Sequence, residues 1–158
     1  MSAPFVSPEG VVLPEWIDHN GHLNLAYYLV LFDHGTDALF NHLGLGEAYR
    51  AASGHGTFAV ESHILYRREL LVGERVRIST TILGADAKRL HLAHEMLRAD
   101  DGTMAAMQEV MFVHVDLAIR RVVTFGPALR ARLHAEATNH AALPRPEWVG
   151  RRLETLAG

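Results

Sequence analysis

Cysteine is absent from the sequence, which excludes disulfides, thiolate chemistry and cysteine-held metals. Positive charge is also scarce, because 15 Lys and Arg stand against 18 Asp and Glu. The resulting net charge of -3 gives no electrostatic reason to expect a nucleic acid or an anionic membrane as partner. The sequence has no basic N-terminal segment followed by an apolar run, and no apolar run long enough to span a membrane. These absences predict a soluble cytoplasmic protein without a signal peptide.

Glycine-rich phosphate-binding motifs are missing as well, so a nucleotide would not be held by a glycine loop. What is present is an ordinary globular composition, with 158 residues of which 49% are hydrophobic. This length predicts one domain with a substantial core. We place that domain at residues 1–138. The remaining tail, 139–158, carries Pro144, Pro146 and Gly150 and is expected to be loosely packed or dependent on a partner.

The longest apolar segment predicts a helix over residues 25–43. Its apolar residues recur at offsets of three, four and seven, and residues 29–32 are apolar on every side. A helix with such a middle is expected to be buried nearly all round. Asn24 is a good N-cap and Gly44 a good left-handed C-cap, so both ends are marked.

Strand signals surround this helix. The segment 5–13 lies between prolines and predicts a short edge strand. Apolar and polar residues then alternate over 57–66, 75–83, 90–98 and 103–116, with a short last strand at 120–124 and a closing helix at 127–137. We expect the four long strands to form a curved antiparallel meander around the helix, with the short first strand and the strand 103–116 at the edges. This is the α+β layout of the hotdog fold.

Polar side chains recur at every second position just before the helix: Asp18, Asn20, His22 and Asn24. In extended backbone, alternate residues point the same way, and Gly21 gives the chain the freedom to curl them together. The stretch is therefore either a site or a helix cap with polar neighbours.

This stretch resembles the hotdog-fold acyl-CoA thioesterases of the 4-hydroxybenzoyl-CoA thioesterase-like family. Asp18 and Gly21 match the Asp-x-x-Gly of that family's active loop, in which Asp is the catalytic carboxylate, and Asn20 and His22 match the Asn-x-His of plant acyl-carrier-protein thioesterases. Segments 14–18, 20–22, 26–28 and 86–91 are similar to betainyl-CoA thioesterases of carnitine degradation. The resemblance covers residues 8–127. It implies a cofactor-free hydrolase of short acyl-CoA thioesters, with betainyl-CoA as the candidate substrate, acting as a dimer or tetramer.

Thioester hydrolysis needs a base or nucleophile and a donor for the carbonyl oxygen. Asp18 could activate water or attack directly, Asn20 and His22 could orient the water or the carbonyl, and amides near residues 23–25 could stabilise the oxyanion. The alternative is that Asp18 and Asn24 are only caps and that His22 is a packed, hydrogen-bonded residue.

Residues outside this stretch are candidates for completing the site. In several hotdog thioesterases a carboxylate of the partner subunit does so, which suggests Glu61 and, less strongly, His63; both are otherwise solvated strand residues. Trp16, Asn24 and Tyr27 are assigned to the acyl group, since aromatic faces attract a trimethylammonium. For Tyr28 and Phe58 we favour plain packing against the helix. The coenzyme A phosphates are assigned to Arg67, Lys88 and Arg89.

Eleven histidines raise the question of a metal. His19 with His22, and His91 with His94, have ligand-like spacing, but three-residue spacing on a strand points two rings to opposite faces, and no metal site is expected. Two other functions stay open. A hotdog hydratase would want an Asp/His pair on another segment, and a non-catalytic hotdog protein would bind acyl-CoA or a small ligand without turnover. A free-thiol assay separates these from a thioesterase.

Overall fold

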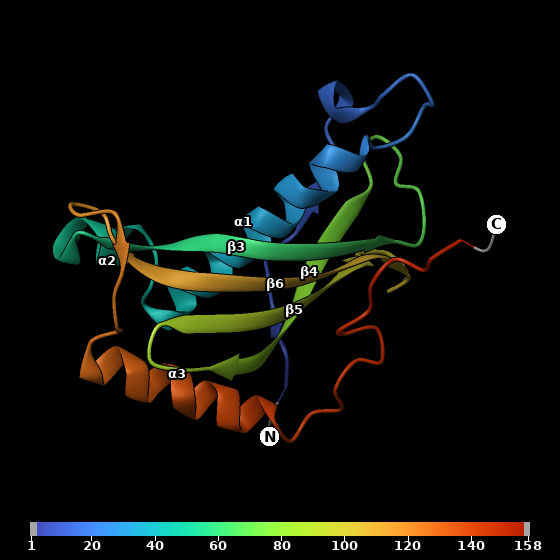
Figure 1. The fold of residues 1–158 in the computed structure, drawn as a ribbon. Helices are drawn as coiled ribbons and strands as arrows, with labels where there is room; N and C mark the ends of the chain where they lie inside the picture. The colour runs from blue at the N-terminus through green and yellow to red at the C-terminus, as the bar shows by residue number, and fades with distance from the viewer. Residues whose placement is uncertain (1–2, 157–158) are drawn as a thin grey trace.

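The computed structural model describes residues 3–156. Its elements in chain order are β1 (Phe5–Val6), β2 (Gly10–Val11), η1 (Pro14–Trp16), α1 (Leu25–Leu43), α2 (Glu47–Ser53), β3 (His55–Tyr66), β4 (Arg75–Ala85), β5 (Arg89–Arg98), β6 (Met104–Asp116), β7 (Arg121–Val122) and α3 (Pro127–His140) (Figure 1). Within residues 3–156, none of the helices combines the length and apolarity that crossing a membrane would need.

The strands form one antiparallel sheet in the order β1-β4-β5-β6-β3, with β2 also on β4 and β7 on β6. The expected meander is confirmed for β4, β5 and β6 but is wrong for β3, which pairs with β6 instead of β4. The reason is the connection over residues 67–74. It is no hairpin turn, because it passes beside the start of α1 and buries Leu70 completely before it reaches β4. Consequently β6 lies inside the sheet, and β3 is the edge strand.

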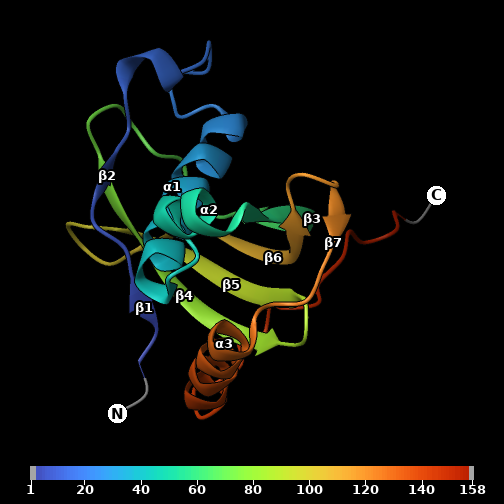
Figure 2. The same cartoon turned by 90° about the vertical axis from the view of Figure 1, so that its left-hand side faces the viewer.

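Helix α1 lies against one face of this sheet (Figure 2). Both predicted ends are confirmed: the Asn24 side chain accepts a hydrogen bond from the Ala26 amide at 3.0 Å, and Gly44 is left-handed with φ 77°. Its packed face comes very near β4, since a Cβ on Gly35 would lie 2.6 Å from the Cβ of Ile78. The expectation of burial all round is wrong, because Leu25 is 64% and Leu29 45% exposed. One chain therefore covers only part of the helix.

A buried histidine links α1 to the sheet. The Thr36 hydroxyl donates to the Phe32 carbonyl at 3.0 Å and so accepts from Nε2 of His94, at 3.2 Å. The Thr80 hydroxyl donates to Nδ1 of His94 at 2.7 Å. Both ring nitrogens of the neutral His94 imidazole are therefore hydrogen-bonded. Complete burial lowers the pKa of His94 to about 3.

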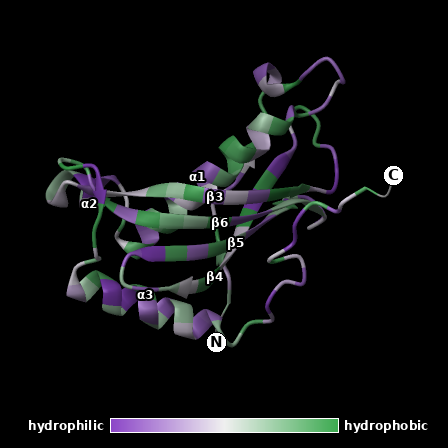
Figure 3. Cartoon of the chain, viewed as in Figure 1, coloured by the Kyte–Doolittle hydropathy of each residue, from purple (hydrophilic) through white to green (hydrophobic). Residues whose placement is uncertain are grey.

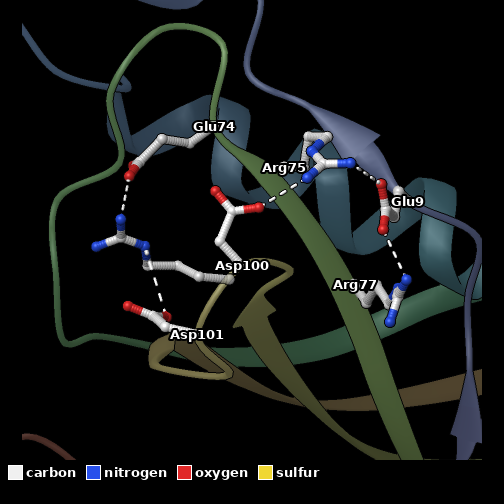
Figure 4. A network of polar contacts seen from close by, with 7 residues as sticks. Glu9, Glu74, Arg75, Arg77, Asp100 and Asp101 are labelled. Atoms are coloured by element: carbon white, nitrogen blue, oxygen red, sulfur yellow. Dashed lines mark hydrogen bonds and ion pairs between the residues drawn. The ribbon is translucent and has the colours of Figure 1, made fainter.

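The N-terminal segment covers the outer edge of β4. Glu9 contacts Arg75 at 3.1 Å and Arg77 at 2.6 Å, and Arg75 also contacts Asp100 of the β5–β6 hairpin at 2.7 Å (Figure 4). These charges fasten β1 and β2 along β4, as the predicted short edge strand over residues 5–13 requires. The opposite edge, β3, carries exposed apolar side chains, and Val60 is 58% exposed. Hydrophobic residues recur along the ribbon of β3 (Figure 3).

The C-terminal tail is partly packed. Helix α3 continues to His140, so the expected boundary at residue 138 falls inside it. Beyond it, Trp148 Nε1 donates to Glu95 at 3.4 Å and the Gly150 amide donates to Glu109 at 2.6 Å. Residues around 148–150 therefore lie on the sheet face opposite α1.

Candidate active site

The polar stretch before α1 is a closed loop. Ile17 and Leu23 form an antiparallel bridge, the Asp18 amide donates to the His22 carbonyl at 3.1 Å, and the Gly21 amide returns to the Asp18 carbonyl at 3.0 Å. Gly21 has φ 81°, which an L side chain rarely adopts. The chain thus curls at Gly21, as expected, and brings Asp18 beside the start of the helix.

The Asp18 carboxylate is held on both oxygens. Its Oδ1 accepts from the Asn20 amide at 2.8 Å and its Oδ2 accepts from the Asn24 side chain at 3.2 Å. The bond from the Asn20 amide, with that from Asn24, lowers the pKa of Asp18 below its ordinary value. Asp18 is therefore a carboxylate at neutral pH. The capping alternative holds for Asn24, whereas Asp18 contacts no amide of the helix itself.

Most backbone amides just before and at the start of α1 already donate a hydrogen bond within the chain. Leu23 donates to the Leu70 carbonyl at 2.8 Å and Asn24 to the Trp16 carbonyl at 2.9 Å. Of the amides proposed for an oxyanion, over residues 23–25, only that of Leu25 has no acceptor within residues 3–156. It lies at the positive end of the helix dipole.

A groove of about 300 Å³ has Leu25 in its wall. It is lined by residues of the loop, of α1 and of the chain that follows β3: His22, Leu23, Leu25, Tyr28, Tyr66, Arg67, Arg68 and Glu69. Nδ1 of His22 lies 3.0 Å from the Leu23 carbonyl, so it carries the proton and leaves Nε2 of the neutral ring as an acceptor. Asp18 is partly exposed on the same loop but is not itself part of the groove wall. The Asn20 side chain is exposed beside it.

Sequence reasoning did not find the contribution of the end of β3. The Tyr66 hydroxyl donates to the Leu25 carbonyl at 3.3 Å, and the Tyr28 hydroxyl donates to the Arg68 carbonyl at 2.9 Å. These contacts depend on the crossing connection after β3, which the predicted meander did not contain. The expectation that Tyr28 packs is consistent with its 4% exposure.

The aromatic pair proposed for the acyl group lies elsewhere. Trp16 and Tyr27 stack on one another at 5.4 Å and pack against a group of buried side chains that includes Leu31 and Phe32 of α1. Leu25 lines the groove, and at about 100° per residue Tyr27 points about 200° around α1 from it. The structure does not bring these rings to the groove.

Phe58 was expected to pack against the helix, and this is wrong. The strand β3 has a bulge between Ala59 and Glu61. Ala59 pairs with Phe112, whose ring contacts Phe40 of α1, so its neighbour Phe58 points to the other face and is 42% exposed.

Glu61 and His63 lie on this other face as well. They line a hollow of about 380 Å³ with His91 and Glu109, which contact one another at 2.7 Å. Between them in sequence, Ser62 instead accepts from buried Gln108 at 2.9 Å on the α1 side. Within one chain, Glu61 and His63 therefore do not lie beside Asp18, and the contribution of Glu61 from a partner subunit stays a prediction. His91 and His94 lie on opposite faces of β5, and no group of three or more His, Asp or Glu within residues 3–156 is arranged to hold a metal.

The cations assigned to coenzyme A are divided between the two ends of the sheet. Arg67 borders the groove. Arg89 of β5 pairs with Val113 of β6, which in turn pairs with Phe58 of β3, so Arg89 lies level with Phe58. Phe58 is eight residues before Tyr66, roughly 26 Å of strand. Arg89 is also held by Asp86 at 2.6 Å. Within one chain, Lys88 and Arg89 therefore do not share a subsite with Arg67.

The antiparallel sheet packed on one long helix is the hotdog fold expected from the sequence, and sequence comparison gives its class. The model of the Thioesterase-like superfamily matches residues 12–133, and the chain belongs to this superfamily. It is an acyl-CoA thioester hydrolase.

Particular relatives narrow the class. The betainyl-CoA thioesterase of Pseudomonas aeruginosa is 44% identical over 96% of this chain and 95% of its own. The L-carnitine dehydrogenase/betainyl-CoA thioesterase of Agrobacterium fabrum is 43% identical over 82% of this chain, which corresponds to 26% of that longer protein. A hypothetical protein of Staphylococcus aureus, solved in complex with CoA, superposes with a TM-score of 0.88 at 27% identity, covering 99% of this chain and 98% of its own.

Proposed function

We propose that this protein hydrolyses betainyl-CoA to betaine and free coenzyme A, with Asp18 as the catalytic carboxylate. The identity to the Pseudomonas aeruginosa enzyme over nearly the full length of both chains supports the substrate. The observation that carries the site is the ionised Asp18, bonded to the N-cap of α1 beside the unoccupied amide of Leu25. We also propose the cytoplasm as its location, because the sequence has no cysteine.

The geometry gives each group a task. The thioester carbonyl oxygen accepts from the Leu25 amide, where the helix dipole stabilises the negative charge that develops. Asp18 then either takes a proton from the attacking water or attacks the carbonyl carbon itself, and in the second route water opens the anhydride. Both routes break the carbon–sulfur bond and release a carboxylic acid and a thiol. Asn24 holds Asp18 in place, and Nε2 of His22 can accept from the water.

Self-association completes the site in this proposal. The free edge of β3 is twelve residues long and carries exposed apolar side chains, which is the kind of edge that a second copy covers. Two-fold pairing of β3 with itself is antiparallel, so the Tyr66 end of one strand lies beside the His55 end of the other. The coenzyme is then held by Arg67 of one subunit and by Lys88 and Arg89 of the other. We propose a dimer, with pairs of dimers as a further level.

A thiol-release assay over a panel of acyl-CoA substrates tests this function. We expect betainyl-CoA to be cleaved with the highest kcat/KM. Absence of thiol release from every acyl-CoA, with coenzyme binding retained, would instead indicate a binding protein.

The Asp18→Asn variant tests the site. We expect kcat to fall by about 10²- to 10⁴-fold while the fold persists, because the amide is neither a base nor a nucleophile. Glu15→Gln is the matched control, since Glu15 is an exposed carboxylate three residues earlier. A wild-type rate in Asp18→Asn would remove Asp18 from the mechanism.

A further inference from the structure

A second hollow lies at the other end of α1 from Asp18. It measures about 580 Å³ and is bounded by the second half of α1, by α2, by the start of β3 and by the β6–β7 turn. Asp37 and Phe40 of α1 line it, together with Gly56 and Thr57 of β3. The proposed site uses none of these residues.

Asp37 is an anion without a partner in this hollow. Of the other charged residues that line it, Glu47 and Arg50 pair with one another at 3.3 Å, and Arg120 lies at the turn after β6. Asp37 makes no hydrogen bond or ion pair with any residue in the range 3–156. The Asp37 side chain is exposed at the rim of the hollow, where partial desolvation, and then the neighbouring carboxylate of Asp33, raise its pKa above the ordinary value. A cation placed in the hollow would relieve both effects.

The proposed dimer brings this hollow to the catalytic groove. The groove lies at the Tyr66 end of β3 and the hollow at the His55 end. Because two-fold pairing sets the start of one strand beside the end of the other, the hollow of one subunit adjoins the groove of its mate. The hollow thereby becomes a chamber for the acyl group whose thioester lies at Asp18 of the other subunit.

We infer that Asp37 of one subunit recognises the quaternary ammonium of the acyl group bound at Asp18 of the other, with the Phe40 ring as its apolar neighbour. This inference rests on the proposed function. A quaternary ammonium suits the position because it keeps its charge at any pH and has no proton to donate. It is attracted by a carboxylate and by an aromatic face. The aromatic pair Trp16–Tyr27 lies at the start of α1, with Tyr27 ten residues before Asp37, and is not needed for this task.

The test compares two substrates of nearly equal shape. They are betainyl-CoA and 3,3-dimethylbutanoyl-CoA, in which carbon replaces the quaternary nitrogen. In Asp37→Asn we expect the betainyl-to-analogue ratio of kcat/KM to fall by about 10- to 100-fold. Asp33→Asn is the matched control, one turn earlier on α1 and outside the hollow, and should keep the wild-type ratio. An unchanged ratio in Asp37→Asn, or an equal loss with both substrates, would overturn the inference. A wild-type enzyme that cleaves neither thioester would instead overturn the proposed function.

Mixed dimers test whether Asp37 acts across the interface. Asp18→Asn and Asp37→Asn subunits are denatured together, refolded at equal ratio and assayed with betainyl-CoA. If Asp37 serves the other subunit, each mixed dimer has one site with both substitutions and one intact site, and activity should recover to about a quarter of wild type. If Asp37 served its own subunit, no mixed dimer would hold an intact site. Activity no higher than the average of the two parent variants would therefore contradict the inference.

Discussion

His94 shows how strongly the fold can fix the charge of one side chain. Its two ring nitrogens are taken by Thr36 and Thr80, and its pKa is lowered to about 3 by burial. The unfolded chain binds a proton at this residue below pH 6.5, whereas the folded chain does not. The stability that depends on neutral His94 is therefore complete above pH 6.5 and is lost progressively as the pH falls toward 3.

We predict that protonation of this residue in the unfolded chain makes the free energy of unfolding about 2 kcal/mol lower at pH 5 than at pH 8. The measurement is urea unfolding at both pH values for the wild type and for His94→Gln, whose amide can still bond both threonines but does not titrate. The pH-dependent loss should be smaller in the variant by that amount. Equal losses in the two proteins would show that His94 is not the group responsible.

For single residues, the sequence predicted which neighbours come together, but not on which face of a strand a side chain lies. Asp18, His22 and Asn24 are near neighbours in sequence, so the turn at Gly21 was enough to bring them together. The sheet faces on which Phe58 and Glu61 lie depend on a bulge at Val60. The alternation of apolar and polar residues in the sequence gives no sign of this bulge. The free amide of Leu25 could be found only once the acceptors of its neighbours were known.

Helix α1 is the element that the rest of the fold positions, and Gly35 sets its distance from β4. A methyl group there would lie 2.6 Å from both Cβ and Cγ1 of Ile78, closer than side-chain atoms approach. Since Ile78 is itself 2% exposed, it has no free space to move into. The helix and the strand would have to separate.

Gly35→Ala is predicted to lower the free energy of unfolding by about 2 kcal/mol, measured by denaturant unfolding. This is opposite in sign to the gain in helix propensity that alanine normally brings. Gly84→Ala on β4 is the control, because no atom lies within 4 Å of its Cβ position, and it should change stability by less than about 0.5 kcal/mol. A neutral or stabilised Gly35→Ala would show that the packing adapts easily.

The elements themselves were predictable because their signals are local. Asn24 and Gly44 mark the ends of α1, and alternation marks the long strands. The order of the strands was not predictable in this way. Gly73 and Glu74 do make a turn, but this turn only ends a connection that has already crossed the sheet, and the position of Leu70 under α1 is a tertiary contact.

The whole molecule is defined by two unequal edges and by a helix that one chain covers incompletely. Leu25 and Leu29 on α1 and Val60 on β3 are exposed in one chain. In the proposed dimer this surface is where the second copy packs, and each site draws on both subunits. Assembly and activity should therefore be lost together.

Val60→Lys is predicted to convert the protein to monomers and to abolish most thioesterase activity, because it places a charge at the middle of the free strand edge. Light scattering coupled to gel filtration measures the mass, and thiol release measures the activity. Val6→Lys is the control, since Val6 is 53% exposed on β1 at the covered edge, and it should leave both unchanged. A fully active monomeric Val60→Lys would disprove the shared site.

The N-terminal segment has a consequence for growth of the assembly. Because the short strands β1 and β2 pair with β4, and Glu9 contacts Arg75 and Arg77 there, β4 presents no long free strand edge on that flank. Strand addition must then stop after one round, giving a closed particle instead of an endless ribbon.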